Sequence, residues 1–215
     1  MKVGILGSGD VAKALGTGFV TLGHPVMLGS RRADNPKATA WAKGTQGKGS
    51  TGTFADAAAF GEVVVLATLG VATPEAIQMA GPSHFDGKVV IDATNPLAFS
   101  EQGLPSLALG HTSSAGEVHQ KALPKAHVVK AFNTTGNARF FRPNFREGPP
   151  TMFICGNDAA AKKKVEGILH DFGWPSVLDI GSIEGSRELE AMCILWVKSA
   201  IVLDDFRIAF RVLQS

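Results

Sequence analysis

Two hydrophobic patterns alternate along the chain. Short, continuous apolar runs rich in Val, Ile and Leu are separated by segments whose apolar residues recur three or four positions apart. The first pattern is typical of strands buried on both faces, and the second is typical of helices with one apolar face. The patterns predict strands over 2–6, 26–28, 63–68, 88–92, 128–133, 151–156 and 176–180. They predict helices over 11–22, 54–60, 74–80, 117–123 and 157–172, a helix that begins at 38–42, and a loop over 44–53.

This alternation predicts an α/β fold, in which helices cover both faces of a mostly parallel sheet. From about residue 182 onward the pattern is helical to the end, and the middle of this stretch has little polar face. A helix that is apolar nearly all round is buried, either under the rest of the chain or against a second subunit. We therefore expect a sheet domain over 1–181 and a short C-terminal helical lobe over 182–215. The pattern favours a homodimer, although packing within one chain would also account for it.

A glycine-rich segment, Gly7-Ser8-Gly9-Asp10-Val11-Ala12, joins the first predicted strand to the first predicted helix. Gly7 permits a tight turn, Gly9 leaves room for a pyrophosphate, and Ala12 lets the helix pack closely on the strand. The free amides at the start of the helix would then face the phosphates. This context predicts a Rossmann-type, doubly wound dinucleotide-binding fold. The alternative is a tight strand–helix turn that binds no ligand.

The end of the second predicted strand indicates which dinucleotide is bound. An NAD-binding chain would carry an acidic residue there to hold the ribose 2′-hydroxyl, whereas this chain reads Gly29-Ser30-Arg31-Arg32. Ser30 could donate a hydrogen bond to a 2′-phosphate, and Arg31 could hold it with a charge-assisted pair. Arg32 could stack on the adenine, and Lys37 could reach the phosphate from the next turn. We expect NADP(H) as cofactor, although each cation taken singly could be a solvated surface residue.

Three predicted strands end in loops rich in amides, hydroxyls and small residues. Ligands of doubly wound sheets lie beyond the carboxyl ends of the strands, so these loops are candidates for the nicotinamide end. The candidate residues are Thr68, Leu69, Asn95, Pro96, Asn133, Thr134, Gly136 and Asn137. The loops hold no paired carboxylates, Ser/His/Asp set or metal cluster. We expect no catalytic acid or base and no metal, because hydride transfer between two rings depends mainly on their positioning. His119 falls near these loops, where a structural or solvated role is the simpler interpretation.

Composition limits the other possibilities. The 215 residues are 45% hydrophobic and 19% charged with a net charge of +2, which is ordinary for a folded domain. The triplet 162–164 is a solvated helix face in our interpretation, so we expect no nucleic-acid partner. The two cysteines lack metal-ligand spacing. Because the first strand begins at residue 2 and the apolar stretch 191–203 is too short for a bilayer, we expect a cytoplasmic protein with no signal peptide and no membrane partner.

With its motifs placed, the chain resembles the NADP oxidoreductases that use an 8-hydroxy-5-deazaflavin coenzyme, and the cytosolic domain of the six-transmembrane ferrireductases. The segments that carry the resemblance run in order over nearly the whole chain. They are 7–9, 22–24, 29–32, 114–117, 129–134, 155–158, 179–182 and 186–187. At Phe132-Asn133 the chain is more similar to the ferrireductase branch. Without the membrane half of those proteins, we expect any iron reduction to pass through a free or loosely bound flavin.

The resemblance implies direct hydride transfer between NADP(H) and a flavin or deazaflavin. It implies that Ser30 and Arg31 hold the 2′-phosphate, that Leu69 and Asn95-Pro96 line the nicotinamide, and that the loop 133–137 contacts its carboxamide. Two alternatives stay open. One is reduction of a small imine or carbonyl, as in the related pyrroline-carboxylate reductases, whose dimerisation domain is longer. The other is a non-catalytic NADP(H) sensor, which would bind NADPH without oxidising it.

Overall fold

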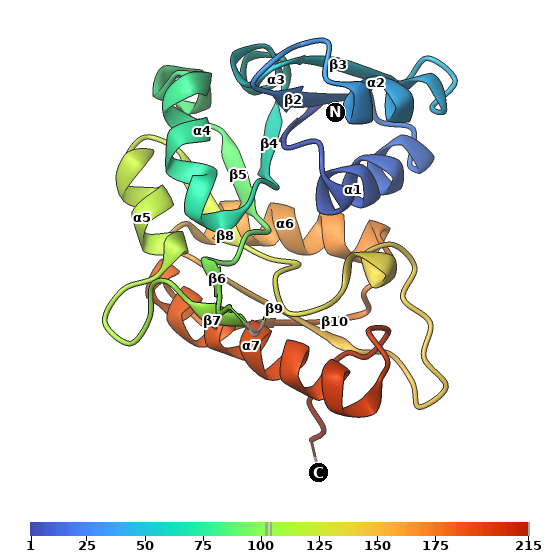
Figure 1. The fold of residues 1–215 in the computed structure, drawn as a ribbon, viewed down its shortest axis with the longest axis vertical. Helices are drawn as coiled ribbons and strands as arrows, with labels where there is room; N and C mark the ends of the chain where they lie inside the picture. The colour runs from blue at the N-terminus through green and yellow to red at the C-terminus, as the bar shows by residue number, and fades with distance from the viewer. Residues whose placement is uncertain (102, 104, 215) are drawn as a thin grey trace.

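A single mixed sheet organises the computed structural model, which describes residues 1–101, 103 and 105–214 (Figure 1). The sheet has eight strands in the order β10-β9-β8-β5-β4-β1-β2-β3, and every neighbouring pair is parallel except β8 and β9. The strands are β1 (Val3–Leu6), β2 (Val26–Ser30), β3 (Gly49–Thr53), β4 (Val63–Leu66), β5 (Val89–Asp92), β8 (His127–Lys130), β9 (Thr151–Gly156) and β10 (Ser176–Asp179). The helices are α1 (Asp10–Thr21), α2 (Pro36–Lys43), α3 (Phe54–Phe60), α4 (Thr73–Ala80), α5 (Ala115–Ala122), α6 (Ala159–Asp171) and α7 (Ser186–Leu203).

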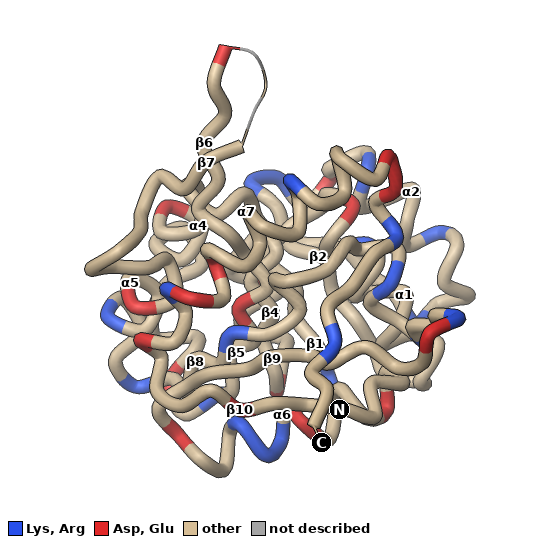
Figure 2. The backbone as a smooth tube through the Cα atoms, turned by 90° about the horizontal axis from the view of Figure 1, so that it is seen from below, with Lys and Arg blue, Asp and Glu red and all other residues tan. Residues whose placement is uncertain are grey.

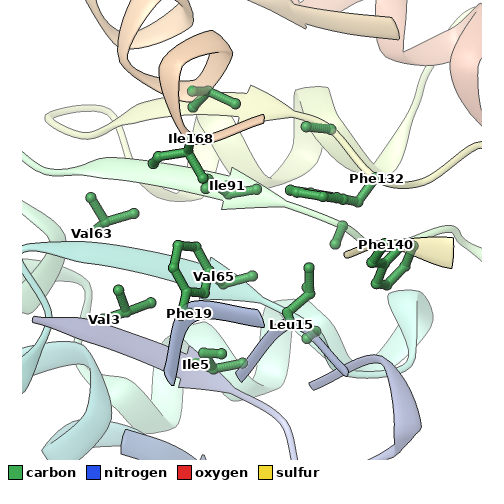
Figure 3. Close-up of a cluster of buried hydrophobic side chains, with 14 of the residues drawn as sticks. Val3, Ile5, Leu15, Phe19, Val63, Val65, Ile91, Phe132, Phe140 and Ile168 are labelled. Atoms are coloured by element: carbon green, nitrogen blue, oxygen red, sulfur yellow. The ribbon is translucent and has the colours of Figure 1, made fainter. Parts of the chain in front are cut away.

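Successive residues of the central strands point to opposite faces of the sheet and build two cores. On one face, Val3, Ile5 and Val65 pack against apolar side chains of α1 and α6, as Figure 3 shows. On the other face, Leu6 and Leu66 pack against α3 and α4. All five side chains are fully buried. Burial on both faces explains the unbroken apolar runs of the sequence, and the α/β, Rossmann-type prediction is confirmed.

The strand order places a topological switch point between β1 and β4. From β1 the chain moves outward through β2 to β3, then returns through α3 to β4 on the other side of β1 and continues through β5 to β8. In open α/β sheets, ligands bind beyond the carboxyl ends of the strands at such a point. We therefore expect a ligand site at the loops that follow β1, β2 and β4.

Three features depart from the sequence-based expectations. The predicted loop 44–53 contains a strand, β3, which pairs with β2 at the sheet edge. A short antiparallel hairpin, β6 (Leu97–Phe99) with β7 (Pro105–Leu107), follows β5. The C-terminal stretch is not helical to its end: α7 stops at Asp204, which is left-handed with φ 51°, and 205–214 carry no helix. The helical lobe itself is present.

In Figure 2, Lys and Arg positions are interspersed with Asp and Glu positions along the backbone, apart from the run of three lysines at 162–164 in α6. Across the described residues, no helix combines the length and the hydropathy that crossing a membrane would require.

Candidate cofactor-binding site

The turn between β1 and α1 uses its two glycines differently. Gly7 has φ +145°, and a Cβ there would lie 2.4 Å from the carbonyl oxygen of Ala67, so both conformation and space require glycine. Gly9 has an extended backbone, and a Cβ there would meet no atom within 4 Å. Helix α1 begins immediately afterward without a side-chain cap on its first amides. An open space therefore lies directly over a helix N-terminus, which is the geometry that binds phosphates.

This space belongs to a cleft of about 660 Å³, within the usual range for a bound small molecule. The cleft brings together eight of the residues that the sequence singled out: Gly7, Ser8, Gly9, Ser30, Arg31, Arg32, Thr68 and Leu69. The sequence analysis did not predict the rest of the lining. Three of these residues lie on α4, one lies just before α4, and three come from other parts of the chain. These lining residues are Asn35, Phe54, Ala67, Ala72, Glu75, Ala76 and Met79.

The three residues at the end of β2 have different surroundings. Ser30 is buried, and its hydroxyl donates to the backbone carbonyl of Arg32 at 2.5 Å, so a bond to a phosphate would have to replace this one. The exposed Arg32 guanidinium donates two hydrogen bonds to Asp34, at 3.0 and 2.8 Å. Arg31 is exposed, and no hydrogen bond or ion pair from its side chain is found within the described parts of the chain. Arg31 is therefore the guanidinium best able to accept a new anion.

Three further candidates lie near the cleft without lining it. Asp10 is exposed on the first turn of α1 and forms an ion pair with Lys13 at 2.7 Å. Val11 is half-buried against the core. Lys37 is exposed on the first turn of α2, where its backbone amide donates to Asn35.

The loops after β5 and β8 are joined by a pair of asparagines. Asn95 donates to the carbonyl of Asn133 at 3.0 Å, and Asn133 donates back to the side chain of Asn95 at 2.9 Å. The same Asn133 amide also donates to the carbonyl of Leu189 in α7. Gly70, which follows Leu69, has no room for a Cβ because the carbonyl of Asn95 would lie 2.0 Å away. The loops after β4, β5 and β8 are thus held against one another.

The remaining candidates in the loops after β5 and β8 differ in how deeply they are buried. Pro96 and Thr134 are buried, while Gly136 and Asn137 are half-buried. A Cβ on Gly136 would lie within 3.1 Å of the Trp196 ring of α7. None of these residues lines the 660 Å³ cleft, so they lie outside the cavity that holds the adenine-side candidates.

Behind the asparagine pair lies a buried ionic cluster, which the sequence reasoning missed. Lys130 Nζ lies 3.0 Å from Asp92 and 2.9 Å from Glu190, and His119 Nδ1 lies 2.9 Å from Asp92. All four side chains are at most 1% exposed. Burial alone would raise the pKa of Asp92, but Lys130, His119 and Thr94 outweigh it and hold this pKa below its usual value. Burial likewise opposes the charge of Lys130, yet the two carboxylates raise its pKa.

Known proteins resemble this chain in sequence and in fold. Residues 2–96 match the family described as NADP oxidoreductase, coenzyme F420-dependent. A protein from Arthrobacter sp. FB24, provisionally described as an F420-dependent NADP reductase, is 33% identical and superposes over the full length of both chains with a TM-score of 0.93. The chain belongs to this family. It is an NADP-dependent oxidoreductase.

Two curated relatives extend the comparison. The chain is 34% identical to rat (Rattus norvegicus) Metalloreductase STEAP3 over 192 residues, which cover 89% of this chain and 36% of that protein. It is 28% identical to the F420-dependent NADP reductase of Methanocaldococcus jannaschii over 209 residues, which cover 92% of this chain and 91% of that one. The chain thus spans about a third of the metalloreductase and nearly all of the archaeal reductase.

Proposed function

We propose that this NADP-dependent oxidoreductase transfers a hydride directly between NADP(H) and a flavin or deazaflavin ring. The observation that carries the proposal is the cleft, in which an open phosphate cradle at α1 shares one cavity with the Arg31 guanidinium, which has no ion pair among the described residues. The nicotinamide would then extend past Leu69 toward Asn95 and Asn133. The names of the Arthrobacter and archaeal relatives support a ring acceptor.

The surroundings of Leu69 also favour a flat, apolar acceptor. Leu69 is 56% exposed, Val71 51% and Phe99 60%. Val71 lies in the 3-10 turn Gly70–Ala72, and strand β6, which carries Phe99, contacts this turn. Apolar side chains left open beside a cofactor site would be covered by a planar ring. In this proposal the protein contributes no catalytic acid or base: it holds two rings together and excludes water.

We also propose that residues 1–181 form the NADP-binding domain, and that 182–215 pack on it and pair with a second copy. Exposed apolar side chains gather on the last turns of α7 and beyond it, at Leu195, Val202, Leu203, Phe206 and Leu213. A dimer would cover them, and sedimentation of the purified protein tests this. Both cysteines are free and buried, which fits a reducing compartment such as the cytoplasm.

The test of the proposed reaction is loss of the near-ultraviolet absorbance of NADPH, with FMN, FAD, riboflavin and the 8-hydroxy-5-deazaflavin coenzyme offered in parallel. Selective turnover with one ring supports the proposal and identifies the acceptor. Turnover only with cyclic imines or small carbonyls would replace it with reduction of such substrates. Tight NADPH binding with no turnover on any acceptor would instead support a redox sensor.

A further inference from the structure

The buried ionic cluster has a connection that stability alone does not explain. Thr94 contacts the cluster through three atoms: its amide and hydroxyl donate to Asp92 at 2.9 and 2.7 Å, and its carbonyl accepts from Lys130 at 2.8 Å. The next residue is Asn95. On the other side of the cluster, Glu190 follows Leu189, whose carbonyl accepts from Asn133. The cluster therefore fixes the backbone on both sides of the asparagine pair.

Glu190 is the member of the cluster that brings α7 into it. Its two carboxylate oxygens accept from the amides of Ala115 and Gly116 at 3.0 and 3.1 Å, at the start of α5, and one of them also lies 2.9 Å from Lys130 of β8. The approach of α5 to α7 is so close that a Cβ on Gly116 would lie 2.1 Å from the Ser186 hydroxyl. A single side chain of α7 thus joins α5, β8 and, through Lys130, the loop after β5.

Buried charges of this kind contribute little net stability to a fold, because removing them from water costs free energy. Apolar residues of similar volume often give equal or greater stability, and in some proteins buried charged groups restrict the packing to one geometry. The cluster also leaves His119 Nε2, and Asn133 Oδ1 beside it, buried without a hydrogen-bond partner among the described residues. Such unsatisfied atoms cost stability. A role in setting geometry accounts for an arrangement that a role in stability explains poorly.

We propose that Glu190 is a positioning residue, which acts through Lys130 and the Leu189 carbonyl to hold Asn95 and Asn133 where the nicotinamide ring binds. It touches neither cofactor nor acceptor. The inference rests on the proposed function because it uses the proposed location of the nicotinamide. It does not depend on the identity of the acceptor. Its consequence is selective: disturbing Glu190 impairs the nicotinamide end and leaves the adenine end, on the far side of the switch point, unchanged.

The test compares two ligands on the Glu190→Gln variant. NADPH carries the nicotinamide, whereas 2′-phospho-ADP-ribose carries the adenine, the 2′-phosphate and the pyrophosphate without it. We expect the affinity for NADPH to fall and the affinity for 2′-phospho-ADP-ribose to stay within about twofold. We expect kcat to fall by about 10- to 100-fold, the effect of a displacement of an ångström or less in a hydride-transfer geometry. The matched control is Glu188→Gln, an exposed glutamate on the same helix, which should behave as wild type.

Each other outcome is informative. Equal loss of affinity for both ligands, or no loss of affinity and kcat for NADPH, overturns the proposal. If Glu190→Gln does not fold, Thr94→Val replaces it, because it removes only the hydroxyl bond to Asp92 and should produce a smaller loss of the same selectivity. If wild-type protein turns over no ring acceptor, the proposed reaction fails, but the binding comparison still decides the role of Glu190.

Discussion

Replacing Arg31 by alanine tests the choice of NADPH over NADH. The exposed Arg31 side chain makes no hydrogen bond or ion pair within the described residues, so the substitution should change the free energy of unfolding by less than about 0.5 kcal/mol. Its loss would therefore be seen only in ligand binding. A charge-assisted hydrogen bond contributes about 1.5–3 kcal/mol. At about 1.4 kcal/mol per tenfold change, the Kd for NADPH should rise by roughly 10- to 150-fold, while the Kd for NADH changes little.

Titration of each variant with NADPH and NADH, followed by calorimetry, measures both constants. Arg32→Ala is the matched control, because Arg32 already donates two hydrogen bonds to Asp34 and would have to give them up to bind a phosphate. We expect a smaller loss of NADPH affinity from that variant. Equal losses for NADPH and NADH in Arg31→Ala would refute the assignment of the 2′-phosphate to this side chain.

Three other predictions follow from packing and charge. Gly9→Val should abolish binding of both dinucleotides but leave the protein folded, because the new side chain meets no protein atom and fills the space that the pyrophosphate needs. Gly7→Val should prevent folding, because its Cβ has no room. Calorimetry measures the binding, and circular dichroism measures the folding. Lys130→Met removes the ammonium group that two buried carboxylates share and should lower the free energy of unfolding in urea by about 3–5 kcal/mol, so a loss below about 1 kcal/mol would contradict the cluster's geometry. Burial raises the pKa of the Cys155 and Cys193 thiols from 9.0 to about 11. Because these thiol pKa values are higher in the folded state, their contribution to the free energy of unfolding is complete below pH 9.0 and is lost as the pH rises toward 11. Each thiol should therefore lower the free energy of unfolding by about 1 kcal/mol at about pH 10. In alanine variants, the free energy of unfolding should depend less on pH in this range.

The sequence predicts the central strands because they are buried on both faces and so carry unbroken apolar runs. It misses β3 because this edge strand reads Gly-Ser-Thr-Gly-Thr, with no hydrophobic residue to mark it. At the other end of the chain the apolar residues continue past α7, but the left-handed Asp204 ends the helix. The segment beyond it is held by long-range bonds instead: Phe210 accepts from the amide of Thr151, and Ile208 accepts from the Trp196 ring nitrogen.

The candidate site likewise has parts that the sequence predicts and parts that it does not. The phosphate cradle and the end of β2 are local motifs, so a single stretch of sequence specifies each. The α4 wall, with Glu75 and Met79, has an ordinary helical sequence and becomes part of the cleft only through packing across the switch point. The ionic cluster joins residues far apart in the sequence, yet one signal was present. Lys130 interrupts the apolar run 128–132, and a lysine buried within such a run requires carboxylate partners.

The cluster also changes what the family resemblance means. Two of the segments that carry the resemblance, 114–117 and 186–187, meet where α5 and α7 touch, and there Arg187 forms an ion pair with Glu117 while Ser114 caps α5. These residues fix the position of α7, and α7 in turn holds Asn133. Similarity at these segments therefore reports how the proposed nicotinamide end is built rather than which acceptor the protein uses. Selectivity for the acceptor should be determined instead by the exposed side chains of Leu69, Val71 and Phe99, which form no part of the buried cores and can change without disturbing the fold.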